Sequence, residues 1–284
     1  PVANAVGMLA DKIIENKGKK IVLVSLARAG IPIGILVKRY IKFKYGINVP
    51  HYSISIIRGR GIDDNAMKYL LEKYRPQQIL FVDGWIGKGA ILNELKKDIS
   101  AYEGVSADIA VVADPANVTE LCGTHEDILI PSSCLNSTVS GLISRTFLRD
   151  DIIGRDDFHG AVYYGELTDS DLSYDFIETI EKEFNMENTP DLEKRVESQG
   201  IDEVINIGKN FGIDDINLIK PGIGETTRVL LRRIPWKVLI DERYKGNPQL
   251  EHIVRLAEEK HTPVEYYPLT HYKCCGIIKK LADA

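Results

Sequence analysis

Short apolar runs alternate with longer segments in which apolar residues recur every three or four positions along the first 190 residues. The runs at 21–24, 79–82 and 109–113, with the segment 52–57, predict strands, because a parallel sheet buries its strands on both faces. The longer segments predict helices at 2–16, 32–40, 64–74, 91–97, 142–148 and 173–185. Strands that alternate with helices predict an α/β fold around a parallel sheet.

The pattern begins again after the polar segment 186–190, which we interpret as a linker. Beyond it the spacing predicts a helix from 222, a strand at 237–241, a helix at 250–260 and a strand at 264–267. A loop at 269–276 is then expected to lead into a last helix. We therefore predict two domains, residues 1–188 and residues 189–284, the second of which includes linker helices and a small α/β/α unit.

The segment that follows the strand at 79–82 carries the clearest chemical signal. Asp83 closes the strand, and a loop with Gly84, Gly87, Lys88 and Gly89 leads into a helix. Such a loop directs free backbone N–H groups and the helix dipole toward one point, which favours an anion, most often phosphate. A carboxylate at the strand end can accept both hydroxyl protons of a ribose. The alternative is a βα turn whose glycines serve only tight packing.

Two further loops carry arginine. Arg28 stands among small residues after the strand at 21–24 and could bind phosphate in a bidentate way, or be a surface cation. Arg58 and Arg60 alternate with glycines after the strand at 52–57, which predicts a mobile cationic loop.

The order of these loops resembles the type I phosphoribosyltransferases, although Gly84 stands where a second acid is usual and Trp85–Gly89 replaces the usual threonine-glycine loop. The resemblance implies a parallel-sheet domain that binds phosphoribosyl pyrophosphate (PRPP) with Mg²⁺. It implies catalytic roles for Asp83, Lys88, Arg58 and Arg60. It also implies PRPP or phosphate contacts for Arg28, Ala29, Gly30, Gly84, Trp85, Ile86, Gly87, Gly89 and Ala90.

Composition and charge narrow the class of protein. The chain of 284 residues is 44% hydrophobic and 27% charged, and no apolar run reaches the roughly 18 residues that span a membrane. No signal peptide is recognisable, and the four cysteines form no C-x-x-C pair, so we expect a cytoplasmic protein without a zinc site. Net charge is −5, but residues 220–284 carry 12 basic and 8 acidic residues, or +4, which indicates a polyanion partner for this part.

The glycine turn at residue 222 leads into the most basic of the predicted helices. Gly222, Gly224, Glu225 and Arg228 resemble the helix start of Pelota-type RNA-binding modules, with Gly224 in place of asparagine. Arg228 and Arg232 share a helix face, since they lie four residues apart. The resemblance implies that these five residues bind structured RNA, together with the loop His271–Gly276. The alternative is an ordinary capping turn with scattered surface arginines.

Together, the two predicted domains resemble a bacterial family that is encoded near tellurium-resistance and stress genes. Some members of that family are called cysteine protease StiP. The family is proposed to make or attach a ribonucleoside, which favours phosphoribose transfer from PRPP to an acceptor that the sequence does not name. We expect the PRPP and RNA sites to be independent because they lie in different domains, and we consider a homodimer.

Two other functions remain open from the sequence. The loss of the second acid at Gly84 suits a sensor that binds ribose phosphate without turnover. A cysteine peptidase would use Cys122 or Cys134 as nucleophile and His125 or His159 as base, and it requires a thiol and an imidazole within hydrogen-bond reach.

Overall fold

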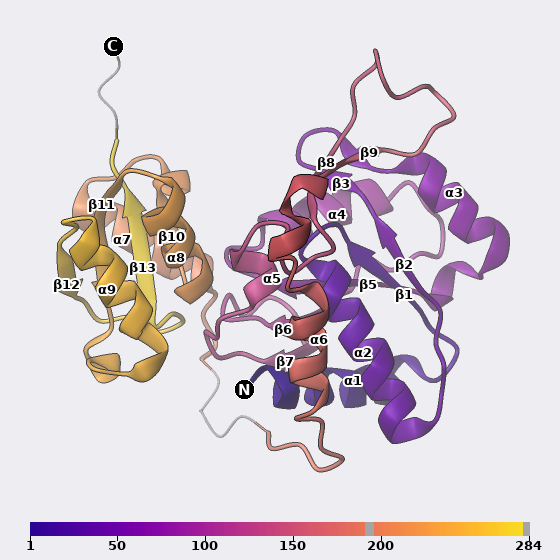
Figure 1. The fold of residues 1–284 in the computed structure, drawn as a ribbon, viewed down its shortest axis with the longest axis horizontal. Coiled ribbons are helices and arrows are strands. Elements are labelled where there is room, and N and C mark those ends of the chain that lie inside the picture. The colour runs from indigo at the N-terminus through magenta and orange to yellow at the C-terminus, as the bar shows by residue number, and fades with distance from the viewer. Residues whose placement is uncertain (191–195, 281–284) are drawn as a thin grey trace.

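The computed structural model describes residues 1–190 and 196–280, and the chain forms two modules that lie side by side (Figure 1). The first module, residues 1–190, is built on a five-stranded sheet in the order β2-β1-β5-β6-β7, in which every neighbouring pair is parallel. Its strands are β1 (Val22–Leu26), β2 (His51–Ile54), β5 (Ile79–Trp85), β6 (Ile109–Ala113) and β7 (Cys122–Thr124). The predicted α/β class is thus confirmed.

Helices cover both faces of this sheet. They are α1 (Val2–Lys17), α2 (Gly30–Tyr45), α3 (Asp64–Lys73), α4 (Ala90–Ile99) and α6 (Ser173–Glu181). Alternate residues of β5 enter opposite cores: Leu80 and Val82 pack with α1, α2 and α6, whereas Ile79 and Phe81 pack with α3 and α4. This two-sided burial explains why the strand is a continuous apolar run.

Two antiparallel ribbons and a short helix stand beside the sheet. The ribbons are β3 (Ile56–Ile57) with β4 (Gly61–Ile62), and β8 (Ile143–Phe147) with β9 (Gly160–Tyr163); the short helix is α5 (Pro131–Cys134). The helix predicted at 142–148 is wrong, because this segment is β8. Leu142 has φ 59°, which starts no right-handed helix, and the β-branched residues that follow suit a strand.

The second module, residues 196–280, has a four-stranded sheet in the order β10-β13-β11-β12. Its elements are α7 (Gly200–Phe211), β10 (Ile219–Pro221), α8 (Ile223–Arg232), β11 (Pro235–Ile240), α9 (Glu251–Glu259), β12 (Val264–Tyr266) and β13 (Cys274–Ile278). The expected last helix is wrong: β13 lies inside the sheet and pairs antiparallel with β10 and β11. The segment 191–195, beside the expected boundary at 188, lies outside the described residues.

The modules meet at the carboxyl ends of β5, β6 and β7. The Tyr272 hydroxyl donates to the Gly87 carbonyl at 2.6 Å. Asp127 of the first module accepts the backbone N–H groups of Ile223 and Lys273 at 3.0 and 2.9 Å. No helix within 1–190 or 196–280 has the length and apolar character needed to span a bilayer.

Candidate functional site

A pocket of about 330 Å³ lies where the two modules meet, and we call it the seam pocket. The first module lines it with Ala29, Arg58, Asp83, Ser133 and the segment Trp85–Ile91. The second module contributes Asn217, Lys220, Pro221, Glu225 and Arg228. The loop after β5 therefore lies in one cavity with the start of α8.

The loop after β5 presents free backbone donors to the seam pocket. Gly89 has φ 87°, a left-handed conformation that glycine adopts without strain, and α4 begins at the next residue. Within the described parts of the chain, the N–H groups of Gly87, Lys88, Gly89 and Ala90 donate to no other group. Free N–H groups at a helix N-terminus are suited to an anion.

Asp83 is the carboxylate of the first module in the seam pocket. Burial raises its pKa to about 7, although the Gly84 N–H, which donates to Oδ1 at 2.7 Å, and Arg28 oppose this effect. A side chain at position 84 would overlap the Ser133 hydroxyl. A side chain at this position would therefore require the Ser133 hydroxyl to move. In the described structure, the buried Ser133 hydroxyl has no hydrogen-bond partner and remains available to a ligand.

Besides Lys88, three cations line the pocket. Arg58 comes from the loop between β3 and β4, Lys220 from β10 and Arg228 from α8. Arg228 also forms an ion pair with Glu225 at 2.8 Å. The pocket therefore carries an excess of positive charge over the carboxylates of Asp83 and Glu225, as an anionic ligand requires.

Arg28 is engaged with protein carbonyls. Its guanidinium donates to the carbonyl oxygens of Ser144 at 2.7 Å, Leu135 at 2.8 Å and Ser132 at 3.1 Å. Burial, and then the charges of Arg228 and Arg232, lower its pKa to about 10. In this conformation Arg28 holds the segment 132–144 over the sheet.

Lys88 is engaged in the same way. Its ammonium donates to the carbonyls of Ile216 at 2.9 Å and Ile219 at 3.0 Å, both in the second module. Burial lowers the pKa of Lys88 to about 8. Lys88 therefore fixes the second module against the loop after β5.

The remaining predicted residues are dispersed. Arg60 lines a separate hollow at the start of α3, and Gly30 lies against the backbone of Val82. Gly222 packs on the Trp85 ring, and Arg232 is exposed at the end of α8.

Within the loop His271–Gly276, Cys274–Gly276 belong to β13 and are buried against α8, so they form no exposed surface with its arginines. His271 bonds Pro115 O at 3.1 Å and Ser198 at 3.0 Å, so this residue lies at the contact between the modules.

The sequence did not predict Lys220 and Asn217 as pocket residues. No local signal marks them, since each enters the pocket through tertiary contact. Arg228, which the sequence assigned to a separate RNA site, lines the same pocket as Asp83.

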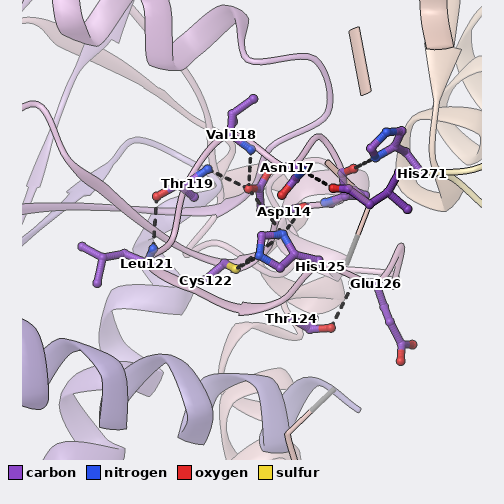
Figure 2. A network of polar contacts seen from close by, with 12 residues as sticks. Asp114, Asn117, Val118, Thr119, Leu121, Cys122, Thr124, His125, Glu126 and His271 are labelled. Atoms are coloured by element: carbon purple, nitrogen blue, oxygen red, sulfur yellow. Dashed lines mark hydrogen bonds and ion pairs between the residues drawn. The ribbon is translucent and has the colours of Figure 1, made fainter. Parts of the chain in front are cut away.

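A second cluster lies beside the seam and contains a thiol, an imidazole and a carboxylate (Figure 2). Cys122 Sγ lies 3.4 Å from His125 Nε2, and His125 Nδ1 lies 2.9 Å from the Asp114 carbonyl and 3.7 Å from its carboxylate. Asp114 Oδ2 accepts the N–H groups of Val118 and Thr119 at 2.7 and 2.8 Å, which fixes the carboxylate. Of the thiol and imidazole pairs considered from the sequence, this is the one brought together.

The other two residues of the peptidase hypothesis lie elsewhere. His159 bonds the Ser55 hydroxyl at 2.9 Å, and Cys134 is buried near Arg228. Cys122 itself is fully buried on β7. Asp114, Cys122 and His125 could also each offer one donor atom to a metal, since these atoms lie within 4.8 Å of one another.

Comparison with known proteins places the chain in a family. Residues 1–181 match the family described as tellurite-like stress resistance cysteine protease StiP. The chain belongs to the StiP family. The cysteine protease StiP of Acinetobacter baylyi is 33% identical to it over 301 aligned residues, which cover 99% of this chain and 78% of that protein.

The second module of this StiP-family protein matches the PELOTA RNA binding domain over residues 198–280. Among solved structures, a hypoxanthine-guanine phosphoribosyltransferase from Bacillus anthracis is 18% identical and covers 43% of this chain and 75% of its own, with a TM-score of 0.33. The enzyme from Leishmania tarentolae in complex with GMP is 14% identical, with the same coverage and a TM-score of 0.32. Both likenesses are partial and weak.

Proposed function

We propose that this StiP-family protein binds PRPP with Mg²⁺ in the seam pocket and transfers phosphoribose to an acceptor. One observation carries the proposal: the free N–H groups of Gly87–Ala90 line the same cavity as Asp83. A phosphate on these donors and a sugar diol on the carboxylate are the two ends of one ribose phosphate.

The pocket residues would have different roles in such a reaction. The N–H groups of Gly87–Ala90 would hold the 5′-phosphate, and Arg58, Lys220 and Arg228 would balance the remaining negative charge. The ionised form of Asp83 would accept the ribose hydroxyls and favour the positive charge that develops on the sugar ring. Catalysis would rest on positioning and electrostatics.

The donor set of the pocket fits Mg²⁺ bound together with its substrate. Mg²⁺ commonly takes one or two carboxylates plus substrate phosphates, and the carboxylates of Asp83 and Glu225 both line the pocket. The ion would neutralise the charge of the leaving pyrophosphate.

The experiment is a calorimetric titration with PRPP and Mg²⁺ of the wild type, Asp83→Asn and the exposed control Asp150→Asn. We expect the first variant to lose at least about tenfold in affinity and the control to bind as the wild type does. Equal affinity of all three proteins would contradict the ribose role. Binding without pyrophosphate release in the presence of candidate acceptors would favour the sensor.

A cysteine peptidase is the second candidate, because Cys122 Sγ lies 3.4 Å from His125 Nε2 and the StiP-family name implies it. A peptide carbonyl has to approach within about 3–3.5 Å of the nucleophile, so the buried thiol would have to become accessible. Cys122→Ser should abolish any peptide hydrolysis, whereas Cys134→Ser should not. Hydrolysis that survives in Cys122→Ser would remove this candidate.

A further inference from the structure

A second pocket, of about 390 Å³, lies between β2, α3 and the β8–β9 ribbon, and we call it the ribbon pocket. Tyr52, Ser55, Tyr69, Phe158 and His159 are among the residues that line it. The loop after β1 separates the two pockets, since Ala27 lines this one and Ala29 lines the seam pocket.

Aromatic rings form one wall of the ribbon pocket. Tyr69 stands edge-on to Tyr52 and to Phe158, with ring centroids 6.3 and 6.2 Å apart. Phe158 is 56% exposed and Tyr69 is 40% exposed, so both rings present apolar surface to solvent at the pocket. Unused aromatic surface at a concave site is typical of ligand binding.

Several polar groups line the pocket, among them the hydroxyls of Ser53, Ser55 and Thr146 and the imidazole of His159. His159 Nδ1 lies 2.9 Å from the Ser55 hydroxyl, and its Nε2 has no partner in the described part of the chain. Asp63 is already satisfied, because it accepts the N–H groups of Ala66 and His159. None of the described residues that line the pocket is Lys or Arg, although Lys73 Nζ lies 4.1 Å from the centroid of the Tyr69 ring.

The pocket is held open by contacts of its own. Asn65 on α3 donates to the carbonyls of Arg155 at 2.9 Å and Asp157 at 2.7 Å. The His159 N–H donates to Asp63 at 2.7 Å. These bonds fix the segment 155–159 over α3, so the pocket is largely formed before a ligand binds.

We propose that the ribbon pocket binds a neutral planar aromatic molecule, which stacks on Phe158, lies edge-on to Tyr69 and shares a hydrogen bond with His159 Nε2. The absence of a lining cation argues against a phosphate, and the aromatic wall favours a flat ring over an aliphatic chain. Nucleobases and indoles share this chemistry. The proposal stands independently of PRPP binding.

Saturation-transfer NMR and calorimetry with adenine and with indole test the proposal and distinguish its two sources. We expect at least one of them to bind the wild-type protein. Phe158→Ala should weaken that binding about tenfold, because base-aromatic stacking is lost. Tyr163→Ala is the matched control, since Tyr163 is an exposed aromatic on β9 outside the pocket, and it should bind as the wild type does.

Two outcomes would overturn the proposal: neither probe binds, or Phe158→Ala binds as tightly as the wild type. Circular dichroism establishes that the variant is folded. Should it not fold, Ser53→Trp obstructs the pocket from an exposed position of β2 and is expected to abolish binding. PRPP affinity should be unchanged in each folded variant.

Discussion

At the scale of single residues, Asp83 is the group on which the proposed ligand binding depends most. Its carboxylate shares the seam pocket with free N–H groups, and burial raises its pKa to about 7. Because the folded pKa lies above the ordinary value, the stability linked to this proton is present at acidic pH and is lost as pH rises through about 7. Ligand binding should have the opposite dependence, since hydroxyls are accepted best by the ionised form.

We therefore predict that PRPP affinity rises by up to about tenfold between pH 6 and pH 8 in the wild type, as Asp83 becomes ionised. Asp83→Asn should show only the smaller change that ligand phosphates cause. Calorimetry across this range in both proteins measures the difference. Parallel pH profiles would show that the Asp83 charge plays no part.

A substitution at Gly84 tests whether a side chain at this position clashes with Ser133. We predict that Gly84→Asp lowers the free energy of unfolding by about 1–3 kcal/mol, because the new side chain meets Ser133. Gly84→Asp combined with Ser133→Gly should recover part of this loss. Urea unfolding of the single and double variants gives the coupling, and an unchanged midpoint for Gly84→Asp would contradict the clash.

At the scale of elements, the contact between the modules depends on the start of α8. Asp127 accepts the N–H of Ile223 with one oxygen and that of Lys273 with the other, and burial raises its pKa to about 6. A carboxylate of the first module thus caps a helix of the second. This contact helps to fix Glu225 and Arg228 in the seam pocket.

We predict that Asp127→Asn lowers the free energy of unfolding by about 1–3 kcal/mol, because an amide has one acceptor oxygen and leaves a buried N–H unpaired. The exposed Asp150→Asn should have no measurable effect. Thermal and urea unfolding compare the two. Equal stability of both variants would show that the cap is not needed.

Elements with a strong local pattern were predictable from the sequence. The apolar run of β5 and the helix expected at 64–74, which is α3, are both confirmed, and the Asp63 carboxylate accepts the Ala66 N–H at the start of this helix. The segments β8 and β13 were not, because a strand pairs with distant residues that local spacing cannot reveal. The strand β7 was not predicted for the same reason. It is only three residues long, and its strand conformation depends on pairing with β6.

At the scale of the whole molecule, the seam pocket belongs to neither module alone. The sequence predicted the Asp83 loop and the α8 arginines as separate sites, but not that Arg228 and Lys220 face the loop. The contact between the modules, which local sequence does not reveal, brings them together. Lys88 was expected to bind phosphate, but its ammonium donates to the carbonyls of Ile216 and Ile219 and so fixes the second module.

Because both modules line the seam pocket, we predict that Arg228 and Arg232 of α8 differ in their contribution to PRPP binding. Arg228→Gln should weaken PRPP binding about three- to tenfold, because it removes a charge that lines the pocket. Arg232→Gln should leave PRPP binding nearly unchanged, since that residue does not line the pocket. Both should weaken binding of structured RNA and reduce its salt dependence. Equal effects on PRPP, or RNA binding that neither variant alters, would contradict this division.

The most direct test of the central claim is a crystal structure of the protein grown with ribose 5-phosphate. The account predicts the phosphate against the N–H groups of Gly87–Ala90 and the ribose hydroxyls on Asp83, with Arg228 of the second module beside the ligand. A seam pocket that stays empty at saturating ligand, or a ligand bound elsewhere with those N–H groups turned away, would contradict it.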